Sequence, residues 1–308
     1  MLYPIQDYFQ KINHHSLKIT NKPSVEIFDD KFGNKLGIFS ILSPHSQLNI
    51  TSNIEIEIKE TIEPIFDTSI EKQWEEYKTL NQDFALREFL FVETIINKNA
   101  IEEIVLSLKN ETKTPLENAK KFSEYIFLNF EYRQGVTSIE TEIDEIWHLK
   151  AGVCQDFAHL LLMMLRIIKI PARYVSGYIC PQNHELRGEG ATHAWVEIFI
   201  PNYGWIGLDP TNNCIASDKH VRLATGRSFA DCTPVKGIFK GNLQHRLEVS
   251  VIVENVDNIQ QNSYSKNLFQ ESNIITNPSF VSVSISDNSN ENSYLVHKQI
   301  QQQIQMQQ

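Results

Sequence analysis

The stretch from Cys154 to Lys169 restricts the fold of this chain more than any other segment. It is strongly apolar around Leu160 to Leu165, and it contains neither glycine nor proline. A stretch of this length is too long for a strand, and a helix with apolar residues around most of its circumference has to be buried. The sequence therefore predicts a buried central helix around which the other elements must pack.

The chain before this helix has the apolar spacing of further helices, from about residue 69 to 150. Thr114 followed by Pro115 is typical of a helix start, because threonine caps the free N–H groups and proline suits the first turn. After the central helix, alternating apolar and polar residues predict strands at 173–179, 194–200, 205–208 and 247–253. Helices followed by an antiparallel sheet indicate an α+β core.

Residues 15–60 alternate with period two, which predicts half-buried antiparallel strands. Between two of these strands, Asp29 to Asn34 combines aspartate, glycine and asparagine and is typical of a hairpin turn. We therefore expect a small antiparallel β domain at 1–62 and the α+β core at 63–257.

The segment 258–308 differs in composition, because 27 of its 51 residues are Asn, Gln or Ser. Such a composition predicts a largely flexible tail. Within it, Phe280 to Ile285 alternates well enough to add an edge strand.

Charge and hydropathy exclude several classes of partner. The net charge is −10, with 28 basic and 38 acidic side chains, so we expect neither nucleic acid nor an anionic membrane as a partner. The longest apolar run is far shorter than the roughly 18 to 20 residues that span a bilayer, and the N-terminus does not resemble a secretory signal. We expect a soluble, cytoplasmic protein, whose oligomeric state the sequence leaves open.

Three positions combine into a possible catalytic site. Cys154 opens the central helix, where the positive end of the helix dipole favours a thiolate. His193 begins one predicted strand and Asp209 ends the next, so both lie at the open end of the hairpin that these strands would form. A thiolate, an imidazole base and a carboxylate that orients it are the groups that acyl transfer through a thioester requires.

Each of these residues also has a simpler interpretation. A cysteine at a helix start is often a small buried apolar residue, a histidine near a tryptophan is often structural, and Asp-Pro is a common turn. The catalytic interpretation is favoured because the predicted elements place all three on one side of a cleft.

The other three cysteines, Cys180, Cys214 and Cys232, are expected to be inert apolar residues. The alternative is a metal site that combines them with His184 or His220, but no two of these ligands have the close spacing of structural zinc sites. No calcium-binding run of Asp and Asn with a central Gly and a terminal Glu is present either, so we predict no metal and no cofactor.

The sequence around the three positions carries a family resemblance. The runs GVCQDFAHLLLMMLRIIKIPARYVSGYI at 152–179 and THAWVEIFIPNYGWIGLDPTN at 192–212 resemble the bacterial transglutaminase-like superfamily. The stretches 14–48 and 220–242 resemble the β domain that precedes this core and the segment that follows it. The resemblance implies a papain-like cysteine-enzyme fold, with a central helix against an antiparallel sheet and a Cys, His, Asp triad in that order.

Position by position, the resemblance implies that Cys154 is the nucleophile, His193 the general base and acid, and Asp209 the residue that orients His193. Thr192 stands where a serine is usual, a departure outside the triad. Further residues lie where the family packs side chains around the cleft, although core positions explain them equally well: Tyr132, Tyr174, Ser176, Trp195 and Asn212.

Three nearby groups have expected roles of their own. The backbone N–H of Cys154 is the expected oxyanion donor. Asp156, in the first helical turn, is expected to stabilise the helix dipole, and His159 to be a core histidine with its hydrogen bonds satisfied.

The expected reaction is attack of Cys154 on a carboxamide or peptide carbonyl of a protein or peptide substrate. Hydrolysis by a protease or amidase is favoured, because it requires only water as acceptor. Transamidation of protein glutamine is the alternative, and a catalytically silent protein-binding module is a third interpretation. The segment from Cys180 to Ala191 beside His193 is a candidate for setting substrate specificity, or is simply a flexible connection.

Overall fold

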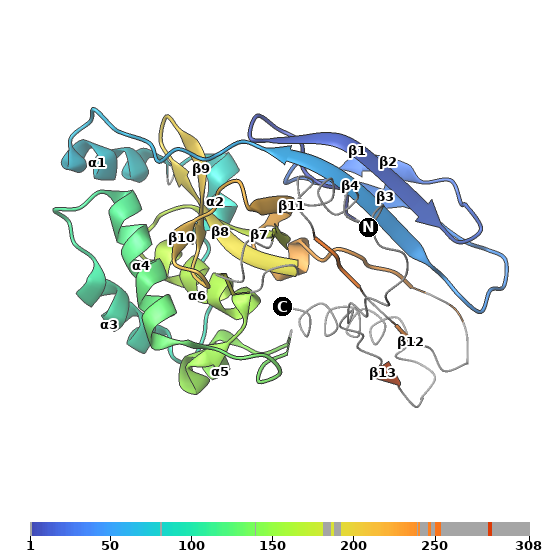
Figure 1. Cartoon of the computed structure of the whole chain (residues 1–308). Coiled ribbons are helices and arrows are strands. Elements are labelled where there is room, and N and C mark those ends of the chain that lie inside the picture. The colour runs from blue at the N-terminus through green and yellow to red at the C-terminus, as the bar shows by residue number, and fades with distance from the viewer. Residues whose placement is uncertain are drawn as a thin grey trace, which may run out of the picture.

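The computed structural model combines an N-terminal pair of small antiparallel sheets with a core of helices and one larger sheet (Figure 1). The mixed helix and sheet class predicted from the sequence is confirmed. The structure describes residues 2–80, 82–138, 140–180, 186–187, 192–238, 240, 246–247, 250–253 and 283–284.

The N-terminal part consists of two strand pairs. Strand β1 (Gln10–Ile19) pairs with β4 (Ile50–Ile58), and β2 (Glu26–Asp29) pairs with β3 (Lys35–Ile38), both antiparallel. In the turn between β2 and β3, the carboxylate of Asp30 accepts the backbone N–H groups of Phe32 and Asn34. The predicted hairpin turn is therefore confirmed.

Two buried amide side chains attach this part to the core strand β11 (His220–Gly226). Asn34 donates to the carbonyl of Thr225 at 2.7 Å and accepts its N–H at 2.8 Å. Gln10 makes the same exchange with Arg222, at 2.8 and 2.7 Å. Each amide thus replaces a neighbouring strand for one residue of β11, and the backbone groups of the buried Thr225 stay paired.

The core contains a group of helices that packs against the sheet (Figure 1). Thr114 caps one of them as predicted: it accepts the N–H of Glu117, whose carboxylate accepts the N–H of Thr114 in return. The helices and 3₁₀ turns before the central helix are α1 (Ile70–Leu80), α2 (Phe84–Arg87), η1 (Glu88–Leu90), α3 (Lys98–Leu108), α4 (Pro115–Asn129) and α5 (Ile143–Leu149), and η2 (Phe229–Asp231) follows β11.

The central helix is α6 (Cys154–Ile167), and its apolar residues are almost completely buried between the sheet and helices α3 and α4. The sheet is antiparallel with the strand order β10, β9, β8, β7, β11. Its other strands are β7 (Ala172–Ile179), β8 (Thr192–Ile200), β9 (Gly204–Asp209) and β10 (Cys214–Ile215). The predicted buried helix is therefore confirmed.

A short parallel pair holds the chain just before α6. Strand β5 (Glu131–Tyr132) lies beside β6 (Ala151–Gly152), with Tyr132 in register with Gly152. The pair fixes the direction in which the chain enters the helix that Cys154 begins.

The predicted strand at 247–253 is wrong in its second half. Strand β12 (Arg246–Leu247) pairs with β13 (Val283–Ser284), whereas residues 250–253 form no regular element. Alternation alone did not suffice there, because a strand also needs a neighbour for its backbone groups. The remainder of the expected edge strand at 280–285 and most of the tail lie outside the described residues. Among the helices that the structure describes, none is long and apolar enough to cross a bilayer.

We predict that Asn34→Ala lowers the free energy of unfolding by about 2 to 4 kcal/mol, because the N–H and carbonyl of Thr225 would be left buried without a partner. Urea denaturation measures the change. Asn53→Ala, at an exposed position of β4, is the matched control and should cost well under 1 kcal/mol. Equal effects of the two substitutions would contradict the docking role of Asn34.

Candidate active site

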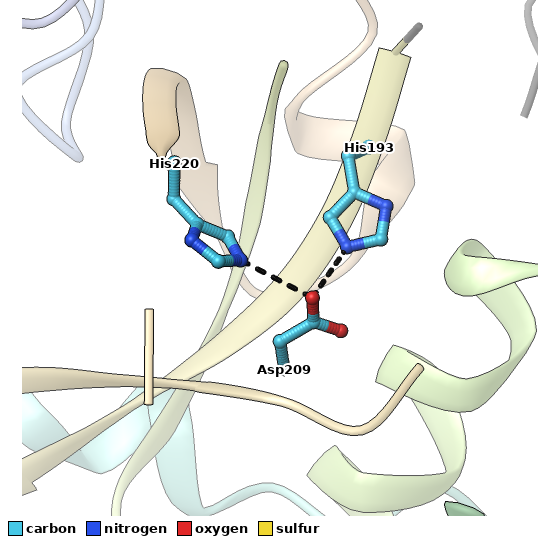
Figure 2. Close-up of side chains that lie close together, drawn as sticks. All are labelled: His193, Asp209 and His220. Carbon is cyan, nitrogen blue, oxygen red and sulfur yellow. Dashed lines mark hydrogen bonds and ion pairs between the residues drawn. The ribbon is translucent and has the colours of Figure 1, made fainter. Parts of the chain in front are cut away.

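The β8–β9 hairpin brings His193 and Asp209 together. In its antiparallel register Val196 faces Leu208, which carries Asp209 to the end of the hairpin where His193 lies. Nε2 of His193 and Oδ2 of Asp209 are 2.8 Å apart (Figure 2). Neither side chain has exposed surface.

The carboxylate of Asp209 accepts hydrogen bonds on both oxygens. Oδ2 accepts from Nε2 of His193, from Nδ2 of Asn212 at 2.8 Å and from Nε2 of His220 at 3.2 Å. Oδ1 accepts the backbone N–H groups of Thr211 at 2.9 Å and of Asn212 at 3.3 Å. All donors point at a side chain that water cannot reach, so the carboxylate is held in one orientation.

These contacts decide the charge of Asp209. Burial alone would raise the pKa of its carboxyl group, but the positive charge of His193 and the hydrogen bonds from His193 and His220 lower this pKa below its ordinary value. Asp209 is therefore an anion at neutral pH.

His193 has the opposite shift. Burial would lower the pKa of its imidazole, but the negative charges of Asp209 and of a Cys154 thiolate raise this pKa above its ordinary value. Because Nε2 is bonded to Asp209, Nδ1 is the ring nitrogen left for another group, and it has no hydrogen-bond partner in the described part of the chain. Cys154, fully buried at the first position of α6, is the nucleophilic group close enough to contribute to this shift.

Asp156 fixes the turn that carries Cys154. Its Oδ2 accepts the N–H of Val153 at 2.8 Å and the hydroxyl of Thr137 at 2.6 Å. Gly152 is required beside it, because a Cβ there would lie 2.5 Å from the same oxygen. Burial raises the pKa of Asp156 to about 6. Asp156 therefore acts on the helix end, as expected from the sequence.

The aromatic residues predicted around the cleft lie close to the three central residues. Trp195 is buried and its ring stacks on His193, with centroids 6.1 Å apart. Tyr132 and Tyr174 both have buried hydroxyls without a partner among the described residues. Burial first, and then the proximity of Cys154 in its thiolate form, raise the pKa of both. These three aromatic side chains thus surround Cys154 and His193.

The remaining predicted residues have different surroundings. Asn212 contacts Asp209 directly, as described above, and also exchanges hydrogen bonds with the backbone of Arg187. Ser176 is buried in β7, in register with Ala194 rather than with a residue of the triad. His159 accepts the N–H of Phe229 on Nε2, and burial followed by the charge of Arg166 lowers its pKa to about 4, which fits the expected core histidine.

Two of the other cysteines have thiols that resist ionisation. Burial raises the pKa of Cys214 to about 12 and that of Cys232 well above its ordinary value. Both shifts agree with the expectation that these residues are chemically inert.

The residue that the sequence reasoning missed is His220, which appeared there only as a possible metal ligand. One ligand atom each from His193, Asp209 and His220 lies within 4.8 Å of the others, close enough for a metal ion. In the structure the two Nε2 atoms are already engaged with the carboxylate (Figure 2). The sequence signal for His220 is its place at the start of the stretch 220–242, which resembles the segment that follows the core in the family.

Family models match two parts of this chain. Residues 102–210 match the family model described as "Transglutaminase-like superfamily", and residues 1–57 match "Bacterial transglutaminase-like N-terminal region". An uncharacterised protein of Mycobacterium tuberculosis is 30% identical over 267 residues, which cover 82% of this chain and 84% of that one.

Two further likenesses are weaker, one in sequence identity and the other in the share of the chain that it covers. A crystal structure from Cytophaga hutchinsonii, described as "a Putative Cysteine Protease", has a TM-score of 0.57 and 23% identity over 74% of this chain and 75% of that one, a likeness of fold. A "Protein-glutamine gamma-glutamyltransferase" of Pseudomonas aeruginosa is 37% identical over 76 residues, which cover 22% of this chain and 11% of that protein.

We predict that the stability supplied by the His193–Asp209 pair decreases both at low pH and at high pH. The lowered pKa of Asp209 stabilises the fold above about pH 4, and this contribution is lost as the pH falls. The raised pKa of His193 stabilises it below about pH 6.5, and this contribution is lost as the pH rises towards the raised value.

The difference in free energy of unfolding between the native chain and the double variant His193→Gln/Asp209→Asn should therefore be largest between about pH 4 and 6.5. Urea denaturation at a series of pH values measures it. A difference that stays constant across that series would show that the two groups do not titrate as a coupled pair.

We also predict that dialysis against EDTA changes neither the melting temperature nor the reactivity of Cys154. Both Nε2 atoms lie within hydrogen-bond distance of Oδ2, so the nitrogens that a metal ion would need are used by the carboxylate. A fall in melting temperature that Zn²⁺ reverses would instead identify the three residues as metal ligands.

Proposed function

Because this chain belongs to the transglutaminase-like superfamily, we propose that it is a cysteine enzyme that transfers acyl groups through a thioester on Cys154. The observation that supports this proposal best is the orientation of His193. Asp209 occupies its Nε2 at 2.8 Å and leaves Nδ1 without a hydrogen bond among the described residues, with Cys154 as the neighbouring nucleophile.

In the proposed reaction, Nδ1 of His193 takes the proton of the Cys154 thiol, and Sγ attacks the carbonyl carbon of a carboxamide or peptide. The N–H of Cys154 at the start of α6 is the proposed donor to the oxyanion that forms. His193 then gives the proton to the leaving amine, the C–N bond breaks and the thioester remains. Asp209 keeps the imidazole in place and stabilises its positive charge at each stage.

Water completes the cycle when His193 takes one of its protons as its oxygen attacks the thioester carbon. The C–S bond then breaks, and His193 returns the proton to the departing sulfur. The products are a carboxylic acid and the free thiol. We favour this hydrolysis, by a protease or amidase acting on protein or peptide, because the three residues supply every group it needs. A primary amine that attacks the same thioester would give transamidation instead.

The proposal includes action in a reducing compartment such as the cytoplasm, where Cys154 remains a thiol. The net charge of −10 gives no electrostatic reason to bind nucleic acid or an anionic membrane, so neither belongs to the proposal. Because the side chains of Cys154, His193 and Asp209 have no exposed surface in this structure, the first chemical probe should be small.

We predict that iodoacetamide at about pH 6.5 modifies Cys154 at least tenfold faster than free cysteine, because Nδ1 of the neighbouring His193 is placed to take the thiol proton. Intact mass and peptide mapping locate the adduct. The adduct should disappear in Cys154→Ala, become at least tenfold slower to form in His193→Ala, and persist in the control variant Cys214→Ala. Modification no faster than that of free cysteine would overturn the proposed nucleophile.

The reaction itself is tested by incubation with a peptide library, with and without an added primary amine. Acid products that Cys154→Ala does not form support hydrolysis, and amine conjugates would replace hydrolysis by transamidation. A reactive Cys154 without any turnover or trapped acyl-enzyme would overturn the enzymatic proposal in favour of a binding module.

A further inference from the structure

A second imidazole reaches the carboxylate of Asp209 from the side opposite His193 (Figure 2). Nε2 of His220 lies 3.2 Å from Oδ2 of Asp209. Nδ1 of His220 accepts the backbone N–H of Ser217 at 3.3 Å. Because Nδ1 is used as an acceptor, the proton of a neutral ring resides on Nε2, and His220 donates to Asp209.

The connection between β10 and β11 brings His220 to this place. These two strands lie at opposite edges of the sheet, so residues 216–219 must cross it. Ala216 packs with Val175 and Trp195. Gly207 makes room for the crossing chain, since a Cβ there would lie 2.6 Å from the Cβ of Ala216.

Trp195 fixes the spacing of the two imidazoles. Its ring stacks on His193 and meets His220 edge to face, with centroids 5.1 Å apart in the second pair. The rings of His193 and His220 are held with centroids 6.0 Å apart. Both histidines are buried, so neither Nε2 can exchange the carboxylate for bulk water.

We propose that His220 is a positioning residue for the catalytic histidine. By donating to Oδ2, the oxygen that also binds His193, it keeps that oxygen turned towards His193 and helps to keep Asp209 ionised. The imidazolium of His193, and with it the thiolate of Cys154, is thereby stabilised. This inference rests on the proposed function, because it assigns His220 a role in the same cysteine chemistry.

The test compares His220→Phe with His220→Gln. Phenylalanine fills the space beside Trp195 without a donor, whereas glutamine places an amide N–H near the position of Nε2. The readouts are the rate of Cys154 alkylation by iodoacetamide and the ultraviolet absorbance of the thiolate, taken as the difference from the matching Cys154→Ala protein. Urea denaturation of each variant measures stability separately.

We expect His220→Phe to slow alkylation about tenfold and to reduce the thiolate absorbance, as loss of one hydrogen bond to a charged group predicts. His220→Gln should remain within about threefold of the native rate. A purely structural role would lower the stability of the variants without changing the reactivity of the protein that remains folded. Unchanged reactivity in folded His220→Phe would therefore overturn the inference and leave the proposed function intact.

An unreactive Cys154 in the native chain would overturn both proposals. If His220→Phe does not fold, imidazole ¹⁵N NMR of the native chain decides, with the His220 signals assigned from His220→Gln. The inference requires a neutral His220 with its proton on Nε2. A proton on Nδ1 would exclude the hydrogen bond to Asp209 and overturn it.

Discussion

The arrangement of the site depends on one buried negative charge. The carboxylate of Asp209 has no contact with water, and an unpaired charge in that position would cost several kcal/mol. The structure offsets this cost with donors from separate parts of the chain: His193 in β8, the backbone after β9, Asn212 in the following turn and His220 in β11. Folding of the sheet and assembly of the site are therefore one event, because the charge is stable only when these elements are in place.

The helix and strands that depend on local sequence patterns could be predicted from the sequence. The apolar run beginning at Cys154 could be buried only as a helix, and the alternation before Asp209 required a hairpin that ends near His193. The role of His220 was not predictable in the same way, because it arises from a chain that crosses the sheet between two edge strands. The docking of Asn34 on Thr225 had no local signal either, since it joins residues 191 positions apart.

Several buried polar atoms near Cys154 are unpaired among the described residues. The hydroxyls of Tyr132 and Tyr174 and Nδ1 of His193 are buried without hydrogen-bond partners in the described part of the chain. Each such atom costs free energy that a purely structural core would avoid. The proposed function pairs Nδ1 of His193 with the Cys154 thiol, and the two tyrosine hydroxyls are the atoms for which a bound substrate would supply partners.

Strand β11 connects the N-terminal sheet to this chemistry. Its first residue, His220, donates to Asp209, while Arg222 and Thr225 exchange hydrogen bonds with Gln10 and Asn34. The register of β11 against β7 shifts between Arg222 and Ala224, so its pairing with the sheet is interrupted beside these contacts. The amide side chains of the N-terminal part pair with the outer edge of β11 on either side of that shift and hold the strand in position. The small β unit is therefore part of the structure that places His220, although it contributes no group to the reaction itself.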